Sequence, residues 1–325
     1  MPRAVIGEAF GPPESYRLVE HDPGLPGPGE VRVAIKAAGV SFVDVLTAKG
    51  EYQFKPALPF IPGSEYAGLV ESLGEGVTGL APGDRVFGSG LGGILAEAAV
   101  FKAAGVTRVP DGMSLEEAAV FPVNYLTAYH ALADRARAQS GETLLVLGAA
   151  GGTGYAAVQV GKQLGLRVVA SASSAAKRDL ARTGGAVAVV ESGAADWRQQ
   201  VSQANDGKPF DIVFDPVGGA ATELAFRTLG YDGRHLVIGF PAGIPALRTN
   251  LALLKCASLV GVQIRGLALD RPAEAEANRQ RVMALAERGV FHPAIARRYP
   301  IEQYAAAMDE AFAGKVAGRI VLTMP

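Results

Sequence analysis

The sequence contains a single cysteine, Cys256, among its 325 residues. One thiol cannot form a disulfide within the chain, and a structural zinc site needs several cysteine or histidine ligands close together. The four histidines are scattered without any metal-ligand spacing, at His21, His130, His235 and His292. We therefore expect no bound metal.

The sequence also lacks an excess of either charge, since 31 Lys and Arg residues stand against 32 Asp and Glu residues. This balance does not favour binding to nucleic acid or to an anionic membrane surface. Residues 1–10 lack the basic segment and apolar core of a signal peptide. The longest stretch without a charged residue, 143–161, contains five glycines and fits a buried strand, turn and helix better than a membrane span. We expect a cytoplasmic protein with no membrane partner.

The first part of the chain, up to about Phe121, consists of short β segments separated by glycine and proline turns. Residues 30–36 alternate strictly between polar and apolar side chains, which predicts a half-buried strand. Further strands are predicted at 66–73, 85–87 and 97–100. Many short strands with irregular turns indicate a small β-barrel-like module.

From about Pro122 the chain alternates between apolar strands and helical segments. The predicted strands are 144–147, 168–171, 186–190, 211–215, 235–239 and 258–264. Such alternation predicts a parallel sheet with helices on both faces. In the tail we predict a helix capped by Asp270 and closed by Gly289, another at 301–312 and a strand at 319–322. Because the tail does not continue the alternation, we assign 1–122 and 265–325 to one domain and 123–264 to the other.

Residues 148–154, Gly-Ala-Ala-Gly-Gly-Thr-Gly, follow a predicted strand and begin a predicted helix. Glycines at such a turn let the backbone approach a pyrophosphate, whose charge is stabilised by the N–H groups and dipole of the helix N-terminus. The alternative is a packing turn without a ligand. The β–α units that follow favour a dinucleotide site.

The end of the second predicted strand carries no acid. Sites that prefer NAD place Asp or Glu about 20 residues after the glycines, on the ribose 2′-hydroxyl. Here residues 171–178 read Ser-Ala-Ser-Ser-Ala-Ala-Lys-Arg. Hydroxyl groups with Lys177 or Arg178 suit a 2′-phosphate, which a carboxylate would repel. The pattern favours NADPH over NADH, unless the two bases are ordinary solvated helix residues.

Eight segments along nearly the whole chain resemble the zinc-free medium-chain dehydrogenases/reductases of the quinone oxidoreductase (zeta-crystallin-like) type. These segments are 38–44 (AGVSFVD), 59–68 (PFIPGSEYAG), 82–86 (PGDRV), 126–129 (LTAY), 148–154, 210–219 (FDIVFDPVGG), 237–240 and 318–322. The resemblance implies an α/β protein with a GroES-like β-barrel catalytic domain and a doubly wound, parallel-sheet Rossmann domain that binds NADP(H).

The resemblance also implies which residues contact the cofactor. Along the pyrophosphate and ribose they are Thr127, Ala150, Gly151, Gly152 and Thr153. Those facing the 2′-phosphate are Ser173, Ser174 and Lys177, and those beside the adenosine ribose and nicotinamide are Val217, Gly239, Phe240 and Val262. Relatives often have tyrosine at the position of Ser192, and its loss weakens the preference for NADPH.

Zinc alcohol dehydrogenases of the same superfamily have a cysteine at or near the position of Ser41, and Gly-His-Glu where this chain has Gly63-Ser64-Glu65. With these ligands absent, the resemblance implies a reaction without zinc. A simple alcohol is then a poor substrate, because its hydroxyl must be deprotonated. Quinones and enones accept a hydride directly, since the developing charge is delocalised onto oxygen.

Three residues are candidates for catalysis. Tyr52 resembles the family tyrosine and is positioned to donate a hydrogen bond or proton to the acceptor oxygen, or else is a surface aromatic residue. Ser41 and Asp44 are candidates for orienting the nicotinamide or a water molecule, although Asp44 equally fits an acid at a helix N-terminus. Asn124, which precedes Thr127, is a weaker candidate.

The predicted function is NADPH-dependent hydride transfer to a small quinone or other α,β-unsaturated carbonyl acceptor, without zinc. Two alternatives stay open, namely reduction of an enoyl thioester such as an acyl-CoA, and NADPH binding without turnover. The last predicted strand, 258–264, is apolar and lies at a sheet edge in the family, which favours a homodimer.

Overall fold

In the computed structural model, which describes residues 1–325, the chain divides into two units. Unit 1 comprises Met1–Pro122 and Pro293–Pro325, and unit 2 comprises Val123–His292. Residues 265–292, which the sequence assigns together with 1–122, belong to unit 2 in this division. The reason is α10 (Pro272–Glu287), whose Val282 is fully buried and whose Asn278 donates a hydrogen bond of 3.2 Å to Asp134 of unit 2.

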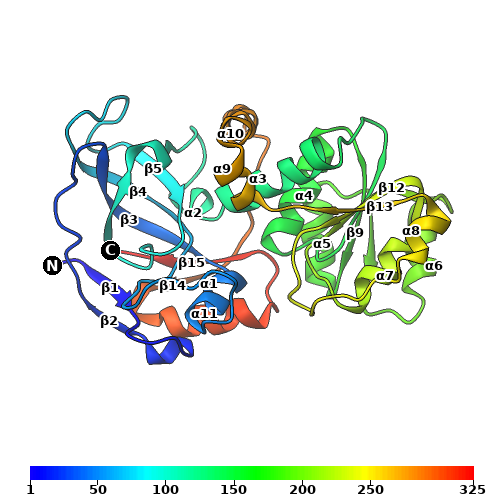
Figure 1. Cartoon of the computed structure of the whole chain (residues 1–325), viewed down its shortest axis with the longest axis horizontal. Helices are drawn as coiled ribbons and strands as arrows, with labels where there is room; N and C mark the ends of the chain where they lie inside the picture. The colour runs from blue at the N-terminus through cyan, green and yellow to red at the C-terminus, as the bar shows by residue number, and fades with distance from the viewer. The chain divides into compact units, whose positions relative to one another are not determined.

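Unit 1 is built on a seven-stranded sheet in the order β14-β15-β3-β4-β5-β7, with β6 paired to β3, beside a two-stranded sheet of β1 and β2 (Figure 1). The strands are β1 (Arg3–Ile6), β2 (Arg17–Glu20), β3 (Glu30–Val40), β4 (Glu65–Leu73), β5 (Arg85–Ser89), β6 (Ala98–Lys102), β7 (Val106–Arg108), β14 (Ile295–Pro300) and β15 (Arg319–Thr323). The helices are α1 (Phe42–Ala48), α2 (Leu115–Ala118) and α11 (Tyr304–Ala313).

Strand β3 is the centre of unit 1. Its predicted alternation is confirmed, because Val31, Val33 and Ile35 are fully buried while the residues between them are half-buried. The strand continues to Val40, so its first half pairs with β6 and its second half with β15. One long strand thereby joins the N-terminal part of the chain to the C-terminal tail.

Unit 2 contains six parallel strands in the order β10-β9-β8-β11-β12-β13 (Figure 1). They are β8 (Thr143–Val146), β9 (Arg167–Ala172), β10 (Ala188–Glu191), β11 (Phe210–Asp215), β12 (Leu229–Val237) and β13 (Ser258–Gly261). The chain winds outward from β8 to β10 and then crosses to β11, so the strand order reverses between β8 and β11. This doubly wound order is the one that binds dinucleotides at the carboxyl ends of its strands.

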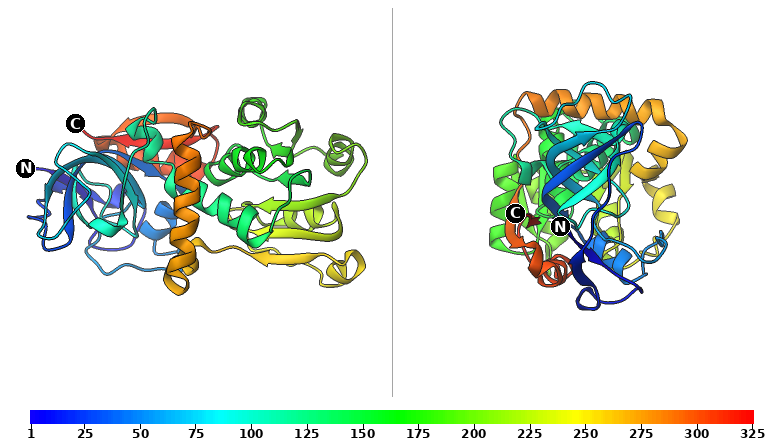
Figure 2. Two further views of the ribbon diagram at one scale, coloured as in Figure 1. Left: turned by 90° about the horizontal axis from the view of Figure 1, so that it is seen from above. Right: turned by 90° about the vertical axis from the view of Figure 1, so that its left-hand side faces the viewer.

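Helices flank both faces of this sheet (Figure 2). They are α3 (Pro122–Tyr129), which continues as a π-helical segment (His130–Arg135), α4 (Gly152–Gln163), α5 (Ala175–Gly184), α6 (Trp197–Ala204), α7 (Ala220–Phe226) and α8 (Asn250–Lys255). None of the helices in the protein combines the length and the apolar character needed to cross a membrane.

Two details of the tail differ from the prediction. The strand predicted at 258–264 ends at Gly261, and a helix that we did not predict, α9 (Ile264–Asp270), follows it. Asp270 therefore ends a helix and does not cap the next one. The N-cap of α10 is Arg271, without a side-chain cap, and Pro272 occupies the first helical position, where its missing N–H leaves one fewer group to satisfy.

Candidate active site

The glycine-rich turn joins β8 to α4. Gly148 has φ +55°, a conformation that glycine adopts without strain, and a side chain on Gly154 would place its Cβ 2.2 Å from the carbonyl oxygen of Gly148. The N-cap of α4 is Gly151, whose lack of a side chain leaves the N–H groups of the first turn without a capping oxygen. Those N–H groups and the helix dipole suit an anion such as a pyrophosphate.

Helix α3 lies beside the start of α4. Thr153 donates a hydrogen bond of 3.0 Å from its hydroxyl to the Oδ1 atom of Asn124, which is buried in α3. Thr127 is buried on the same helix, and Ala150 is 1% exposed. Asn124, which the sequence suggested only as a weaker candidate, is thus hydrogen-bonded to one of the predicted cofactor residues, Thr153.

The end of β9 carries hydroxyl groups and a base, as the sequence indicates. Ser173 and Ser174 are exposed, and Ser174 is the N-cap of α5, where its oxygen accepts from the N–H of Lys177 at 3.3 Å. Partial burial lowers the pKa of Lys177. An acid from the neighbouring strand also lies at this end of the sheet. It is Glu191, at the end of β10, which pairs with Arg178 of α5 at 3.5 Å.

Four further predicted residues follow the carboxyl ends of neighbouring strands. Val217 comes after β11, Gly239 and Phe240 after β12, and Val262 after β13. Because the strands are parallel, these residues and the glycine-rich turn share one edge of the sheet. Val217 reaches the turn itself, since its Cγ2 atom lies 2.9 Å from the position that a Cβ on Gly148 would take. These residues thus lie along the carboxyl edge of a sheet whose strand order reverses between β8 and β11.

In unit 1, Ser41 and Asp44 form a capping box at the start of α1. The Asp44 carboxylate accepts from the Ser41 N–H at 2.7 Å and from the Ser41 hydroxyl at 2.6 Å, while Ser41 accepts from the Asp44 N–H at 3.3 Å. Asp44 is therefore an acid at a helix N-terminus, which is one of the two roles that the sequence suggests for it. Tyr52 lies in the loop after α1, half-exposed, and its N–H donates to Leu46 at 3.2 Å.

A buried ion pair in the same unit was not predicted. The Arg319 guanidinium of β15 lies 2.9 Å from the carboxylate of Glu65 on β4, and Glu65 is 1% exposed. Ser64, its neighbour in the chain, forms a hydrogen bond with Asp44 that acts to lower the pKa of Asp44. Glu65 and Arg319 are 254 residues apart, so no local pattern signals the pair.

Asp44 gives a testable dependence of stability on pH. Burial raises its pKa above the ordinary value of 3.8, against the opposing effects of Ser41, Ser64 and Arg319. A carboxyl group whose pKa is raised by folding binds more protons in the folded state than in the unfolded state. Its contribution to the free energy of unfolding is therefore fully present below pH 3.8 and is lost as the pH rises through the pKa of the folded state. We expect the free energy of unfolding of the wild type, minus that of Asp44→Asn, to fall with rising pH. Urea unfolding over a pH series measures it, and a difference that grows with pH would contradict it.

The side chains present do not fit a zinc ion. No three Cys, His, Asp or Glu side chains come together as a possible metal site. Ser41 and Ser64 offer hydroxyl groups, where zinc prefers thiolate, imidazole or carboxylate ligands. Cys256 lies exposed at the end of α8.

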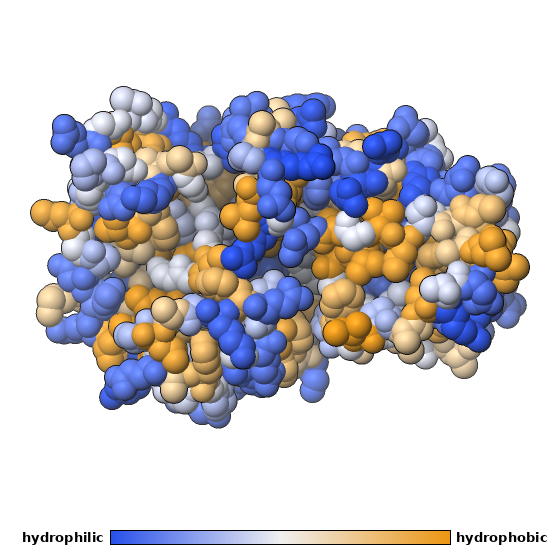
Figure 3. Space-filling model, viewed as in Figure 1, coloured by the Kyte–Doolittle hydropathy of each residue, from blue (hydrophilic) through white to orange (hydrophobic).

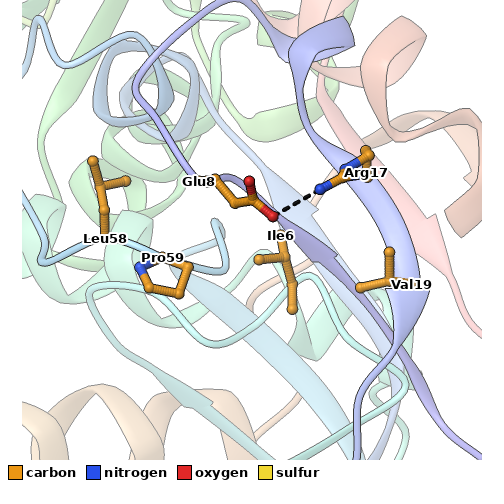
Figure 4. Close-up of a pocket in the computed structure, with 6 residues that line it drawn as sticks. All are labelled: Ile6, Glu8, Arg17, Val19, Leu58 and Pro59. Carbon is orange, nitrogen blue, oxygen red and sulfur yellow. Dashed lines mark hydrogen bonds and ion pairs between the residues drawn. The ribbon is translucent and has the colours of Figure 1, made fainter.

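Figure 4 shows a surface pocket of unit 1. It has a volume of about 430 Å³ and is lined by Ile6, Glu8, Arg17, Val19, Leu58 and Pro59. Two of these residues, Glu8 and Arg17, form an ion pair at 2.7 Å. None of the predicted catalytic or cofactor residues lines this pocket.

Comparisons with known proteins agree with this architecture. Residues 27–111 match the alcohol dehydrogenase GroES-like domain, and residues 152–282 match the zinc-binding dehydrogenase family. The chain is 34% identical over 300 residues to quinone oxidoreductase-like protein 2 of Mus musculus, covering 92% of this chain and 86% of that one. It is 33% identical to the quinone oxidoreductase of Pseudomonas aeruginosa, covering 99% of each.

A solved mycobacterial structure complexed with NADPH is similar along 99% of this chain and 100% of that one, with a TM-score of 0.88 and 27% identity. The two matching domains and the relatives extend over both units described above. The chain therefore belongs to the quinone oxidoreductase family of medium-chain dehydrogenases/reductases.

Proposed function

We propose that the protein is an NADPH-dependent reductase of quinones or other α,β-unsaturated carbonyl compounds, and that it works without zinc. The observation that carries the proposal is the shared edge of the parallel sheet in unit 2, where an uncapped helix N-terminus lies with Ser173, Ser174 and Lys177. NADPH bound there supplies the hydride. The similar mycobacterial structure complexed with NADPH and the relatives named quinone oxidoreductase support the cofactor and the acceptor class.

In this proposal each group of residues has a separate task. The backbone of Ala150, Gly151, Gly152 and Thr153 binds the pyrophosphate at the N-terminus of α4. Val217, Gly239, Phe240 and Val262 provide the surface for the adenosine ribose and the nicotinamide. Ser41 and Asp44 hold the start of α1 through their capping box, which keeps Ser41 in place to orient the nicotinamide or a water molecule.

The activity is tested by following NADPH absorbance with 1,4-benzoquinone, phenanthrenequinone, a 2-alkenal and crotonyl-CoA. We expect oxidation with the quinones or the alkenal, and the same rate after treatment with a metal chelator. Turnover of crotonyl-CoA alone would instead assign enoyl-thioester reduction. If the protein binds NADPH but turns over none of these acceptors, the proposed reductase activity is refuted. NADPH binding without turnover is then the remaining alternative.

Tyr52 is proposed as the hydrogen-bond or proton donor to the acceptor oxygen. Tyr52 is half-exposed on a loop. Tyr52→Phe removes only that hydroxyl, and we expect kcat to fall about tenfold or more while NADPH affinity stays the same. An unchanged kcat would make Tyr52 a surface aromatic residue.

Lys177 is expected to determine the choice of cofactor. It is the first base of α5, the helix whose N-cap is Ser174, and loss of a charge-assisted hydrogen bond to a phosphate costs about tenfold in affinity. Lys177→Ala should raise KM for NADPH by about this factor and leave KM for NADH unchanged. Arg182→Ala is the matched control, because Arg182 lies on the same helix and pairs with Asp179. An equal loss for both cofactors would contradict the assignment.

We also propose that the protein forms a homodimer through the β13 edge of the parallel sheet. β13 ends the strand order and its Leu259 is 52% exposed, and α8, which precedes it in the chain, carries the exposed Leu253 and Leu254. Figure 3 shows apolar residues gathered over α8. We expect a dimer on size exclusion with light scattering, and a monomer for Leu259→Glu. A monomeric wild type would refute the dimer.

A further inference from the structure

One buried carboxylate in unit 2 has no part in the function proposed so far. Asp215 ends β11 and is 2% exposed, yet its two oxygens accept four hydrogen bonds. The donors are the N–H groups of Val217 and Gly218, both at 2.9 Å, the Thr222 hydroxyl at 2.6 Å and the His235 Nε2 atom at 3.0 Å. Three different elements are thereby tied to one side chain: β11 with its following turn, α7 and β12.

His235 contributes to this network at a cost to the core. It is fully buried in β12, where its ring stacks on Phe226 with centroids 5.8 Å apart. A carboxylate only accepts, so the Nε2 atom of His235 carries the proton that it donates. The Nδ1 atom has no hydrogen-bond partner. A buried ring nitrogen without a partner costs stability that an aliphatic residue at this position would not cost.

The turn that Asp215 holds packs against two other segments of the cofactor edge. Gly218 and Gly219 both have positive φ, +74° and +60°, and a side chain on either would collide with the backbone of residues 240–243. The Gly219 N–H donates to Gly243 at 2.7 Å, and the Ala242 N–H donates to Val217 at 2.9 Å. On its other side, Val217 packs against Gly148 of the glycine-rich turn.

We propose that Asp215, Thr222 and His235 form a positioning network that fixes the turn of residues 216–219, and that the fixed turn sets the affinity for NADPH. The inference rests on the proposed function, because it takes NADPH as the ligand of this edge. The three residues act through Val217 and through the loop at residues 239–243, which carries Gly239 and Phe240. None of the three needs to touch the cofactor.

The charge state of Asp215 agrees with this role. Burial alone would raise its pKa, but the hydrogen bonds from His235, Thr222 and the Gly218 N–H, with the proximity of His235, lower it below the ordinary value. Asp215 is therefore a carboxylate, able to accept all four bonds at once.

The test uses Thr222→Val, which removes the hydroxyl at almost constant volume, and Thr222→Ser, which keeps it. We expect Thr222→Val to raise Kd and KM for NADPH about tenfold with kcat nearly unchanged, because the lost interaction serves binding. Thr222→Ser should bind NADPH like the wild type. His235→Leu provides a second variant, and it should likewise weaken NADPH binding, because it removes the hydrogen bond that His235 donates to Asp215.

The outcomes separate positioning from mere structural support. If Thr222→Val and His235→Leu lower Tm but leave Kd for NADPH unchanged, the network supports only the fold and the inference is overturned. If Thr222→Ser loses affinity as Thr222→Val does, the hydroxyl is not the cause, and the inference is likewise overturned. A wild type that fails to bind NADPH in the same titration would refute the proposed function and this inference together.

Discussion

Gly154→Ala is expected to lose NADPH binding and much of its stability, whereas Gly151→Ala should lose only binding. A Cβ on Gly154 would lie 2.2 Å from the carbonyl oxygen of Gly148, a distance at which the backbone itself must move. The contact is between two parts of the glycine-rich turn, so no flexible side chain can absorb it. We expect a loss of about 3 kcal/mol in the free energy of unfolding, and a loss in affinity on the order of 100-fold from the displaced turn.

Gly151 provides the matched control for this prediction. A Cβ there meets only the Gly148 carbonyl oxygen at 3.5 Å, an ordinary contact, and the residue has φ −80°, which alanine adopts freely. Its stability should therefore stay within about 0.5 kcal/mol of the wild type. Its affinity should still fall, because the pyrophosphate must approach the backbone at this glycine.

Thermal unfolding and fluorescence titration with NADPH measure the two effects separately for each variant. If Gly151→Ala binds NADPH as tightly as the wild type, the pyrophosphate does not lie at the N-terminus of α4. If Gly154→Ala is as stable as the wild type, the close approach of Gly154 to Gly148 is not what shapes the turn.

The parallel sheet of unit 2 could be predicted because each strand is a short apolar run that ends at a recognisable turn. The same pattern pointed to the glycine-rich turn at 148–154 and to the hydroxyl and basic residues at 171–178, whereas the other candidate cofactor residues were implied by the family resemblance. Elements without such a pattern were missed. β14 contains Arg297 and Arg298, both exposed, so its sequence resembles a loop. In α9, Gly266 interrupts the apolar run that continues from the preceding strand.

Side-chain contacts between residues on different strands could not be predicted either. From the sequence, Asp215 was assigned to the end of one strand and His235 to the start of another. Nothing in the sequence indicated that the two side chains are in contact, although they are just 20 residues apart. Their contact depends on β11 pairing with β12 in a register that aligns Val213 with His235. Sequence patterns indicate which residues form a strand, but this register depends on how the whole sheet packs.

The ion pair between Glu65 and Arg319 depends on register in the same way. β4 and β15 are separated by β3, and Gly39 of β3 aligns with Glu65 on one side and with Val321 on the other. A Cβ on Gly39 would lie 3.2 Å from the guanidinium of Arg319. The absence of a side chain at Gly39 therefore leaves room for Arg319 to reach across the middle strand to Glu65.

We expect Arg319→Met to lower the free energy of unfolding by about 4 kcal/mol, because it leaves the carboxylate of Glu65 buried without its cation. This is a large part of the total stability of a typical domain. The double variant Arg319→Met with Glu65→Gln should recover much of the loss, since the buried charge that lost its cation is gone. Urea unfolding of the wild type, the single variant and the double variant gives the comparison. A double variant as unstable as Arg319→Met alone would mean that the loss comes from the packing of the Arg319 side chain and not from the charge of Glu65.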